Sequence, residues 1–78
     1  MHILLIPKRH IPSLDQLKEA DLPVIGRMVT VASKLAKDEG VAEKGYRLAI
    51  NCGQEGGQLV PHLHMHLLGG QKLSDTLG

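Results

Sequence analysis

The most informative stretch of this sequence is His62-Leu63-His64-Met65-His66-Leu67-Leu68, which holds three of the five histidines. Successive side chains of a β-strand point to opposite faces, so the three histidines share one face and the apolar residues between them share the other. The apolar face can pack against a core. Imidazoles gain nothing from such packing, because aliphatic side chains bury at a lower desolvation cost. The stretch therefore predicts a strand with one core face and one face that is free for chemistry.

Length and composition restrict the classes of protein to consider. A chain of 78 residues forms a single small domain, because a chain of this size buries only about 60% of the surface that it exposes when unfolded. Hydrophobic residues make up 42% and charged residues 22%, which is typical of a globular chain and excludes disorder. The net charge of +1 is too small for a broad nucleic-acid or anionic-membrane surface. We therefore expect one domain over residues 1–78 that binds no nucleic acid and no membrane.

Cysteine content and targeting signals indicate the compartment. Cys52 is the single cysteine, so an internal disulfide is excluded, and we expect a small core residue rather than a reactive thiol. No apolar run approaches the roughly 20 residues that span a bilayer. The few apolar residues before Pro7 do not make a signal peptide. The expected location is a reducing cytoplasm.

One long helix is predicted in the first half of the chain. Asp21 is its expected N-cap, Pro23 lies in its first turn, and Gly40 ends it. Gly26 inside the helix suggests the close approach of another backbone. Apolar residues repeat at three and four positions, which predicts one core-facing stripe. Its members are Ile25, Met28, Val29, Ala32, Leu35 and Ala36.

Three strands complete the expected fold. Residues 3–6 form an uninterrupted apolar run, which predicts a strand buried on both faces. Residues 46–52 alternate apolar and polar side chains and predict a half-buried strand. A glycine-rich turn at residues 53–57 leads to a last strand over residues 60–68. The predicted class is α+β, with about three strands covered by one long helix.

Three interpretations of the histidine face compete. The histidines could be solvated side chains on an open sheet, or two of them could bind Zn²⁺; Cys52 and the acidic residues offer no evident further ligand. The third interpretation is nucleophilic catalysis on phosphorus, with one imidazole attacking and its neighbours moving protons. Asn51 and the turn at residues 53–57 favour this reading, because glycine lets backbone N–H groups cradle an anion.

At this point the residues resemble a known family. HLHMHLL is similar to the His-φ-His-φ-His-φ-φ signature of the histidine triad (HIT) superfamily. LLIPKRHI at the start, GYRLAINCGQEGGQ before the triad and HLLGG after it resemble the Hint branch, the nucleoside phosphoramidases. The resemblance extends from His2 to Gly70. It implies a HIT-like antiparallel sheet with one helix packed on it.

The resemblance also implies roles for the three histidines of the triad. His64 occupies the position of the nucleophile, which attacks the α-phosphorus and forms a covalent nucleotidyl-histidine that water hydrolyses. His66 matches the histidine that contacts phosphate and helps the leaving group depart. His62 matches the histidine that supports the orientation of the nucleophile. An ordinary histidine pKa near 6.5 leaves most imidazole neutral at pH 7, so the nucleophile needs orientation more than activation.

Four further residues take roles from the same resemblance. Asn51 falls where the family places a polar amide near phosphate and ribose, and Gly57 and Gln58 belong to the phosphate-binding turn. His10 matches a further histidine near the site, where either a catalytic or a structural role is open. We expect the neighbouring Lys8 and Arg9 to form a solvated loop rather than a phosphate clamp.

The sequence departs from the family pattern in three places. Family members carry a segment before LLIPKRH that forms the nucleobase and ribose pocket, and Met1 begins where that segment ends. We therefore expect a HIT domain that is truncated at its N-terminus. Leu59 replaces a phosphate-contacting Ser or Thr of many relatives, and Pro61 favours an irregular start of the last strand.

The expected partners follow from these features. The resemblance implies a purine nucleotide or nucleoside phosphoramidate as substrate, with no cofactor and no metal. An exposed strand edge is a template for pairing with another chain, so we expect a homodimer formed by the Gly26 face of the helix and the strand at residues 46–52. The alternative is a HIT protein that binds nucleotide or phosphate, or serves as a scaffold, without catalysis.

Overall fold

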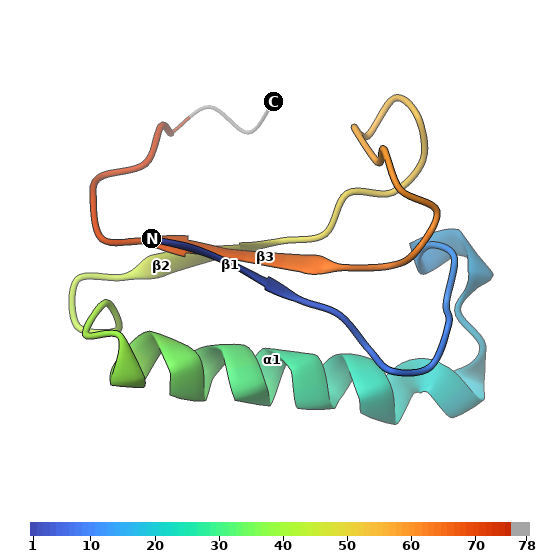
Figure 1. The fold of residues 1–78 in the computed structure, drawn as a ribbon, viewed down its shortest axis with the longest axis horizontal. Coiled ribbons are helices and arrows are strands. Elements are labelled where there is room, and N and C mark those ends of the chain that lie inside the picture. Colours follow the sequence, from blue (N-terminus) through green and yellow to red (C-terminus); the bar gives the residue numbers. More distant parts are fainter. Residues whose placement is uncertain (76–78) are drawn as a thin grey trace.

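The computed structural model describes residues 1–75. The fold is one layer of sheet on one helix (Figure 1). The elements follow in the order β1 (His2–Leu5), the short 3-10 helices η1 (Leu14–Gln16) and η2 (Glu19–Asp21), α1 (Leu22–Asp38), β2 (Tyr46–Ala49) and β3 (Met65–Gly69).

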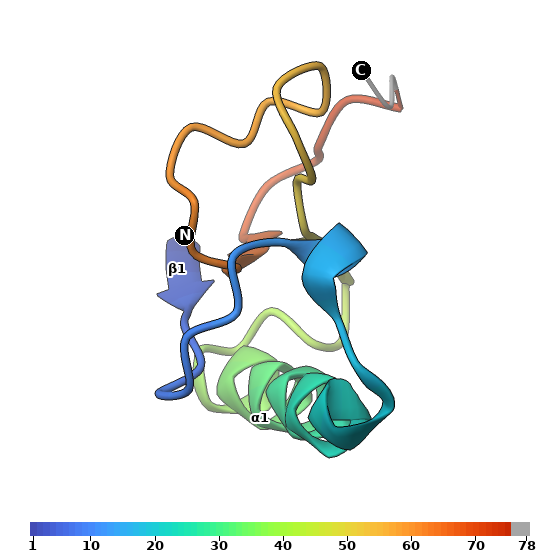
Figure 2. The ribbon, with the colours of Figure 1, turned by 90° about the vertical axis from the view of Figure 1, so that its right-hand side faces the viewer.

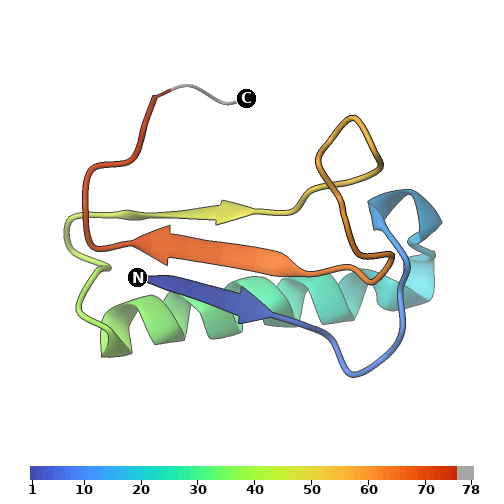
Figure 3. The same ribbon diagram turned by 45° about the horizontal axis from the view of Figure 1, so that its top comes forward.

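The three strands form one antiparallel sheet in the order β1-β3-β2. The last strand in the sequence is therefore the central one, with β1 and β2 on either side of it (Figure 3). Helix α1 covers one face, and Figure 2, which looks along the helix, shows the opposite face carrying only loops. The predicted α+β class, an antiparallel sheet with one long helix, is confirmed.

The core lies between α1 and the sheet. Ala32 and Ala36 are fully buried on the helix, and their small side chains let the helix lie close to the strands. From the sheet side, Leu63 and Leu67 are the largest fully buried side chains. Met28 and Met65 are also buried, which confirms that they are packing residues. The remaining buried apolar residues are Leu5, Ile11 and Val41.

The ends of α1 confirm the predicted helix with one correction. Asp21 is at the N-cap position, Pro23 lies in the first turn, and Gly40 follows the end with φ +74°. However, the Asp21 side chain makes no cap hydrogen bond to α1. It accepts the Lys18 backbone N–H at 3.0 Å instead. Val29 was expected in the core stripe but is 44% exposed, because it lies on the flank of the helix.

The predicted strand boundaries need correction at all three strands, and β1 spans His2–Leu5 rather than residues 3–6. β1 is an edge strand, and the expectation of burial on both faces is wrong: Leu4 is 51% and Ile6 58% exposed. An apolar run alone does not fix the position of a strand within a sheet. β2 ends at Ala49 rather than 52, and β3 begins at Met65 rather than 60. Residues 60–62 are bends, so the irregular path expected at Pro61 is confirmed.

Two further expectations are corrected. The position of a Gly26 Cβ has no atom within 4 Å in the described chain, so no backbone of this chain packs there. Cys52 is half-buried and lies outside the core, because the backbone leaves the sheet after Ala49. Among residues 1–75, no helix has both the length and the apolar character needed to cross a membrane.

Candidate active site

The site lies on the face of the sheet that α1 does not cover. The β3 register pairs His66 with Leu4 on β1 and with Ala49 on β2, and directly paired residues share a face of a sheet. Leu63, Met65 and Leu67 are buried on the helix side, whereas the three histidines between them are only half-buried. The alternation extends through residues 62–64, which precede β3. The three histidine side chains therefore lie along an extended segment, on the face of the sheet that points away from the core.

His64 is held in one tautomer by its own backbone. Its Nδ1 lies 2.8 Å from the carbonyl oxygen of His62. A carbonyl oxygen can only accept, so Nδ1 carries the hydrogen and donates it. In the neutral ring the lone pair then lies on Nε2. This arrangement leaves one nucleophilic nitrogen, held in a fixed direction.

His66 forms a ring-to-ring contact with His2. The His2 Nε2 and His66 Nδ1 atoms are 2.8 Å apart, and the ring centroids are 5.0 Å apart. One nitrogen must donate and the other accept, so this hydrogen bond is lost when both rings are protonated. Burial lowers the pKa of His66 below its ordinary value of 6.5, and the charges of His64 and His2 lower it further. His66 is therefore held in its neutral form at neutral pH.

His62 faces the loop that follows β1. Its Nε2 lies 3.4 Å from the Pro7 carbonyl oxygen, and its ring meets the ring of His10 edge-on, with centroids 4.9 Å apart. The structure thus brings His10 to the triad. The rings of His64 and His66 are also neighbours, with centroids 5.1 Å apart. The ring contacts thus form two groups, His2-His66-His64 and His10-His62, and the hydrogen bond between His64 Nδ1 and the His62 carbonyl connects them.

The glycine-rich turn is closed by its own backbone. Gly53 and Gly57 have φ values of +74° and +83°, which glycine adopts readily. The Gly57 N–H donates to the Gln54 carbonyl at 3.1 Å, and the Gln58 N–H donates to the Gly53 carbonyl at 2.9 Å. The resemblance placed Gly57 and Gln58 in the phosphate-binding turn, and in this structure their two backbone N–H groups donate within the turn itself.

Two amide side chains brace the same turn. The Gln58 Oε1 accepts the Gly53 N–H at 2.9 Å, and its Nε2 donates to the carbonyl of Pro12 at 2.7 Å and to that of Val60 at 3.0 Å. The Asn51 Nδ2 donates to the Gly56 carbonyl at 2.8 Å. These contacts fix the shape of the turn beside the histidine face.

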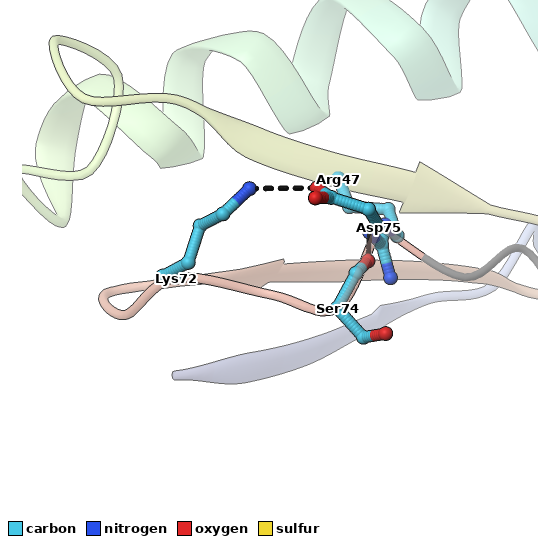
Figure 4. Close-up of polar contacts among 4 residues, drawn as sticks. All are labelled: Arg47, Lys72, Ser74 and Asp75. Carbon is cyan, nitrogen blue, oxygen red and sulfur yellow. Dashed lines mark hydrogen bonds and ion pairs between the residues drawn. The ribbon is translucent and has the colours of Figure 1, made fainter.

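The segment after β3 passes along the same side of the sheet as the turn (Figure 1). The Arg47 guanidinium on β2 donates a hydrogen bond to the Ser74 carbonyl, and Lys72 forms an ion pair with Asp75 at 2.8 Å (Figure 4). The Lys72 and Asp75 side chains are largely exposed, so this pair contributes little to stability. The Arg47 contact ties the end of the described chain to the sheet.

The structure gives no support to the Zn²⁺ interpretation. Within residues 1–75, no group of three His, Cys, Asp or Glu side chains is placed to hold a metal ion. His64 Nδ1 and His66 Nδ1 already face the His62 carbonyl and His2. The solvated-surface interpretation also fits poorly, because the rings face one another and backbone carbonyls rather than water alone.

Sequence reasoning missed two residues of this site. His2 contacts His66 across 64 positions of the sequence, and its only signal was its place immediately before the strand predicted at residues 3–6. Gly56 is the tightest position of the turn, because a Cβ there would lie 2.3 Å from the Cys52 carbonyl oxygen. The run of glycines marked the turn without showing which of them it requires.

Comparison with protein families gives a direct assignment. The family model of the HIT domain matches residues 1–73. The chain belongs to the HIT family. This agrees with the resemblance drawn from HLHMHLL and its flanking residues.

Individual relatives agree with this assignment. The chain is 50% identical over 76 residues to a purine nucleoside phosphoramidase of Escherichia coli, an alignment that covers 97% of the chain and 64% of that protein. The chain thus spans about two thirds of the length of this curated relative. A HIT family hydrolase of Legionella pneumophila has a similar fold, with a TM-score of 0.95 at 42% identity over 99% of this chain and 69% of that one. A histidine triad protein of Clostridium difficile gives a TM-score of 0.92 at 40% identity, over 96% and 65% of the two chains.

Proposed function

We propose that this protein is a nucleotide hydrolase or transferase that acts on the α-phosphate of purine nucleoside phosphoramidates. The observation that carries the proposal is the hydrogen bond from His64 Nδ1 to the His62 carbonyl, at 2.8 Å, which leaves Nε2 as the nucleophile. The 50% identity to a purine nucleoside phosphoramidase supports the substrate class. The mechanism uses the histidines and requires no cofactor.

The reaction proceeds in two displacements. The His64 Nε2 attacks the α-phosphorus, and the bond between phosphorus and the leaving nitrogen breaks. The protonated form of His66, a minor species that the lowered pKa makes a stronger acid, donates a proton from Nε2 to the departing amine and becomes neutral. Water then attacks phosphorus and gives a proton to His66, while the phosphorus bond to His64 breaks. The products are an amine and a nucleoside monophosphate, and both histidines return to their starting state.

The other site residues orient the reacting groups and take no part in bond making or breaking. His62 orients His64 through its carbonyl oxygen. Asn51, Gly57 and Gln58 hold the turn beside the phosphate, and in the proposed mechanism the remaining donors of this turn face the phosphate oxygens. Such fixed donors stabilise the charge that spreads over phosphorus in the transition state. In this mechanism His10 holds the His62 ring in place through their edge-on contact.

Hydrolysis of adenosine 5′-phosphoramidate by the parent chain and by His64→Ala tests the proposal. Both proteins are first shown to be folded by circular dichroism and thermal unfolding. We expect turnover by the parent and none above background for His64→Ala, because alanine has no nitrogen to replace Nε2 as the nucleophile. Equal turnover by the two proteins would contradict the assignment of His64.

A second candidate is a HIT protein that binds nucleotide or phosphate without turning it over. The observation in its favour is that the N–H groups of Gly57 and Gln58 donate within the turn, which leaves fewer donors for a transition state. A folded parent without turnover that binds AMP no more tightly than inorganic phosphate would support this candidate. Turnover, or binding that depends on the nucleoside, would count against it.

We also propose that the protein is a homodimer in the cytoplasm. Leu22, Gly26 and Val29 follow one another at four and three positions on α1, and Leu22 and Val29 are 56% and 44% exposed. No atom of the described chain lies within 4 Å of a Gly26 Cβ position, so a second helix can approach there. β2 is an edge strand and can pair with a second copy.

Light scattering after size exclusion tests the dimer. We expect twice the chain mass for the parent and the monomer mass for Val29→Glu, which buries a charge in the proposed contact. Lys34→Glu is the control, since Lys34 is exposed on a different side of α1. A monomeric, folded parent would overturn this proposal.

A further inference from the structure

Residues 7–11, between β1 and η1, make two contacts with His62, the first histidine of the triad, and one with the Leu63 backbone that follows it. Pro7 places its carbonyl oxygen 3.4 Å from His62 Nε2, and His10 packs its ring edge-on against the His62 ring. The third contact is between backbones: the Leu63 N–H donates to the Ile11 carbonyl at 2.7 Å. This loop and the triad therefore form one packed unit.

The third contact acts on the peptide group that orients the nucleophile. The Leu63 N–H and the His62 carbonyl belong to the same planar peptide unit, and in a trans peptide they point in opposite directions. Ile11 holds the N–H side, and His64 Nδ1 donates to the C=O side. A rotation of this peptide unit would break both hydrogen bonds. The position of the loop therefore sets the direction and the tautomer of the His64 ring.

An ion pair between the exposed Arg9 and the buried Asp21 connects the loop to the start of the helix. Arg9 Nη1 lies 3.3 Å from Asp21 Oδ1. Asp21 is 4% exposed, and it is the single buried polar residue among residues 1–75. Its Oδ2 accepts the Lys18 N–H, whereas Oδ1 is buried without a hydrogen-bond partner in the described structure. A carboxylate in such a place is costly unless a charge compensates it, and the Arg9 guanidinium is that charge.

We infer that Asp21 and Arg9 are positioning residues for the nucleophile, acting through Ile11 and the peptide unit between His62 and Leu63. The role of this pair in catalysis rests on the proposed function. Its effect on the orientation of the His64 ring does not depend on the proposed function, because it rests only on contacts within the protein. The pair thus links the N-terminus of α1, a structural element, to the nitrogen atom that attacks phosphorus.

Asp21→Asn and Arg9→Gln test this inference with matched controls. Each variant removes one charge of the pair and keeps the approximate size of the side chain. Glu19→Gln removes the same charge from the same 3-10 helix, and Lys8→Gln removes a charge next to Arg9. Both control residues are exposed, and neither takes part in an ion pair in the described structure.

The first readout is the tautomer of His64, measured by ¹⁵N NMR of the imidazole nitrogens. In the parent and in both controls, Nδ1 should give the shift of a protonated ring nitrogen and Nε2 that of an unprotonated one. In Asp21→Asn and Arg9→Gln, we expect both shifts to move toward the average of the two tautomers. A loss of stability alone does not produce this change in the folded protein. The Arg9 side chain is more than half exposed, so we expect Arg9→Gln to fold. Unchanged shifts in this variant would overturn the inference.

The second readout separates this inference from the proposed function. We expect kcat for the phosphoramidate to fall about tenfold in either variant with little change in KM, since small misplacements of reacting groups have effects of this size or larger. The double variant should be no worse than the single ones, because the two residues act as one unit. If the tautomer changes but the parent has no turnover, the proposed function fails and the positioning pair stands. If turnover is present and the shifts and kcat do not change, the positioning pair fails alone.

Discussion

On the helix side of the extended segment at residues 62–67, Leu63, Met65 and Leu67 are 1%, 3% and 0% exposed, whereas the histidines that alternate with them are half-buried. The apolar residues are held in place by packing against α1. The histidines are held by polar contacts instead: His66 and His62 contact His2 and the Pro7 carbonyl, far away in the sequence, and His64 contacts the nearby His62 carbonyl. The helix side of the sheet therefore stabilises the fold. The open side carries the imidazoles, which are held by polar contacts rather than by packing.

The largest effect on stability is expected on the helix side. Leu67→Ala should lower the free energy of unfolding by about 3 kcal/mol, through lost burial and the cavity that remains. Leu68→Ala is the matched control on the next residue of the same strand; Leu68 is half-buried on the open face, so we expect a loss of about 1 kcal/mol. Denaturant unfolding measures both. Equal losses of unfolding free energy in the two variants would contradict the claim that the helix side carries more of the stability than the open side.

A smaller effect is expected in the turn beside the histidine face. Gly56→Ala places a Cβ 2.3 Å from the Cys52 carbonyl oxygen, and the backbone must move to relieve the clash. We expect a loss of about 2 kcal/mol in stability and a clear loss of turnover. Glu55→Ala is the control for stability, because Glu55 lies in the same turn and is exposed. A fully stable and active Gly56→Ala would show that the turn is not required in this shape.

The smallest effect concerns protonation on the open face. Burial first, then the charges of His64 and His2, lower the pKa of His66 below 6.5. The folded protein therefore binds fewer protons than the unfolded chain as the pH falls through 6.5, so stability is highest above that pH and is lost toward the folded-state pKa. His66→Asn should make stability less dependent on pH in this range. Denaturant unfolding at several pH values measures the slope, and an unchanged slope would contradict the lowered pKa.

His2→Gln sharpens the same comparison. It removes one of the charges that lower the pKa of His66, so that pKa should move toward its ordinary value, as measured by NMR titration of the ring protons. His10→Gln is the control, because His10 contacts His62 rather than His66. A pKa of His66 that moves equally in both variants would show that the contact with His2 is not responsible.

The fold was largely predictable from local pattern. The spacing of apolar residues between Pro23 and Gly40 identified α1, and the alternation around His64 identified the two faces. The strand ends were not predictable, since they depend on which partner each residue finds. The apolar run at residues 3–6 was misread for the same reason: its character is that of a buried strand, but the order β1-β3-β2 places it at an edge.

The site was predictable in its residue types but not in its connections. The motif pointed to His62, His64 and His66, and the structure brings His10 to them. The contact of His2 with His66 and the ion pair of Arg9 with Asp21 depend on long-range folding, and no local spacing signals them. For the same reason, the sequence could not show that Gln58 would direct its side chain to the Pro12 carbonyl.

The most direct test of the central claim is to trap the covalent intermediate. The folded protein is mixed with adenosine 5′-phosphoramidate, quenched rapidly under alkaline denaturing conditions that preserve phosphohistidine, and digested for mass spectrometry. We predict an adenylyl group on His64 in the parent, and no adduct in His64→Ala. Turnover without an adduct, or an adduct on another residue with turnover retained in His64→Ala, would contradict the account.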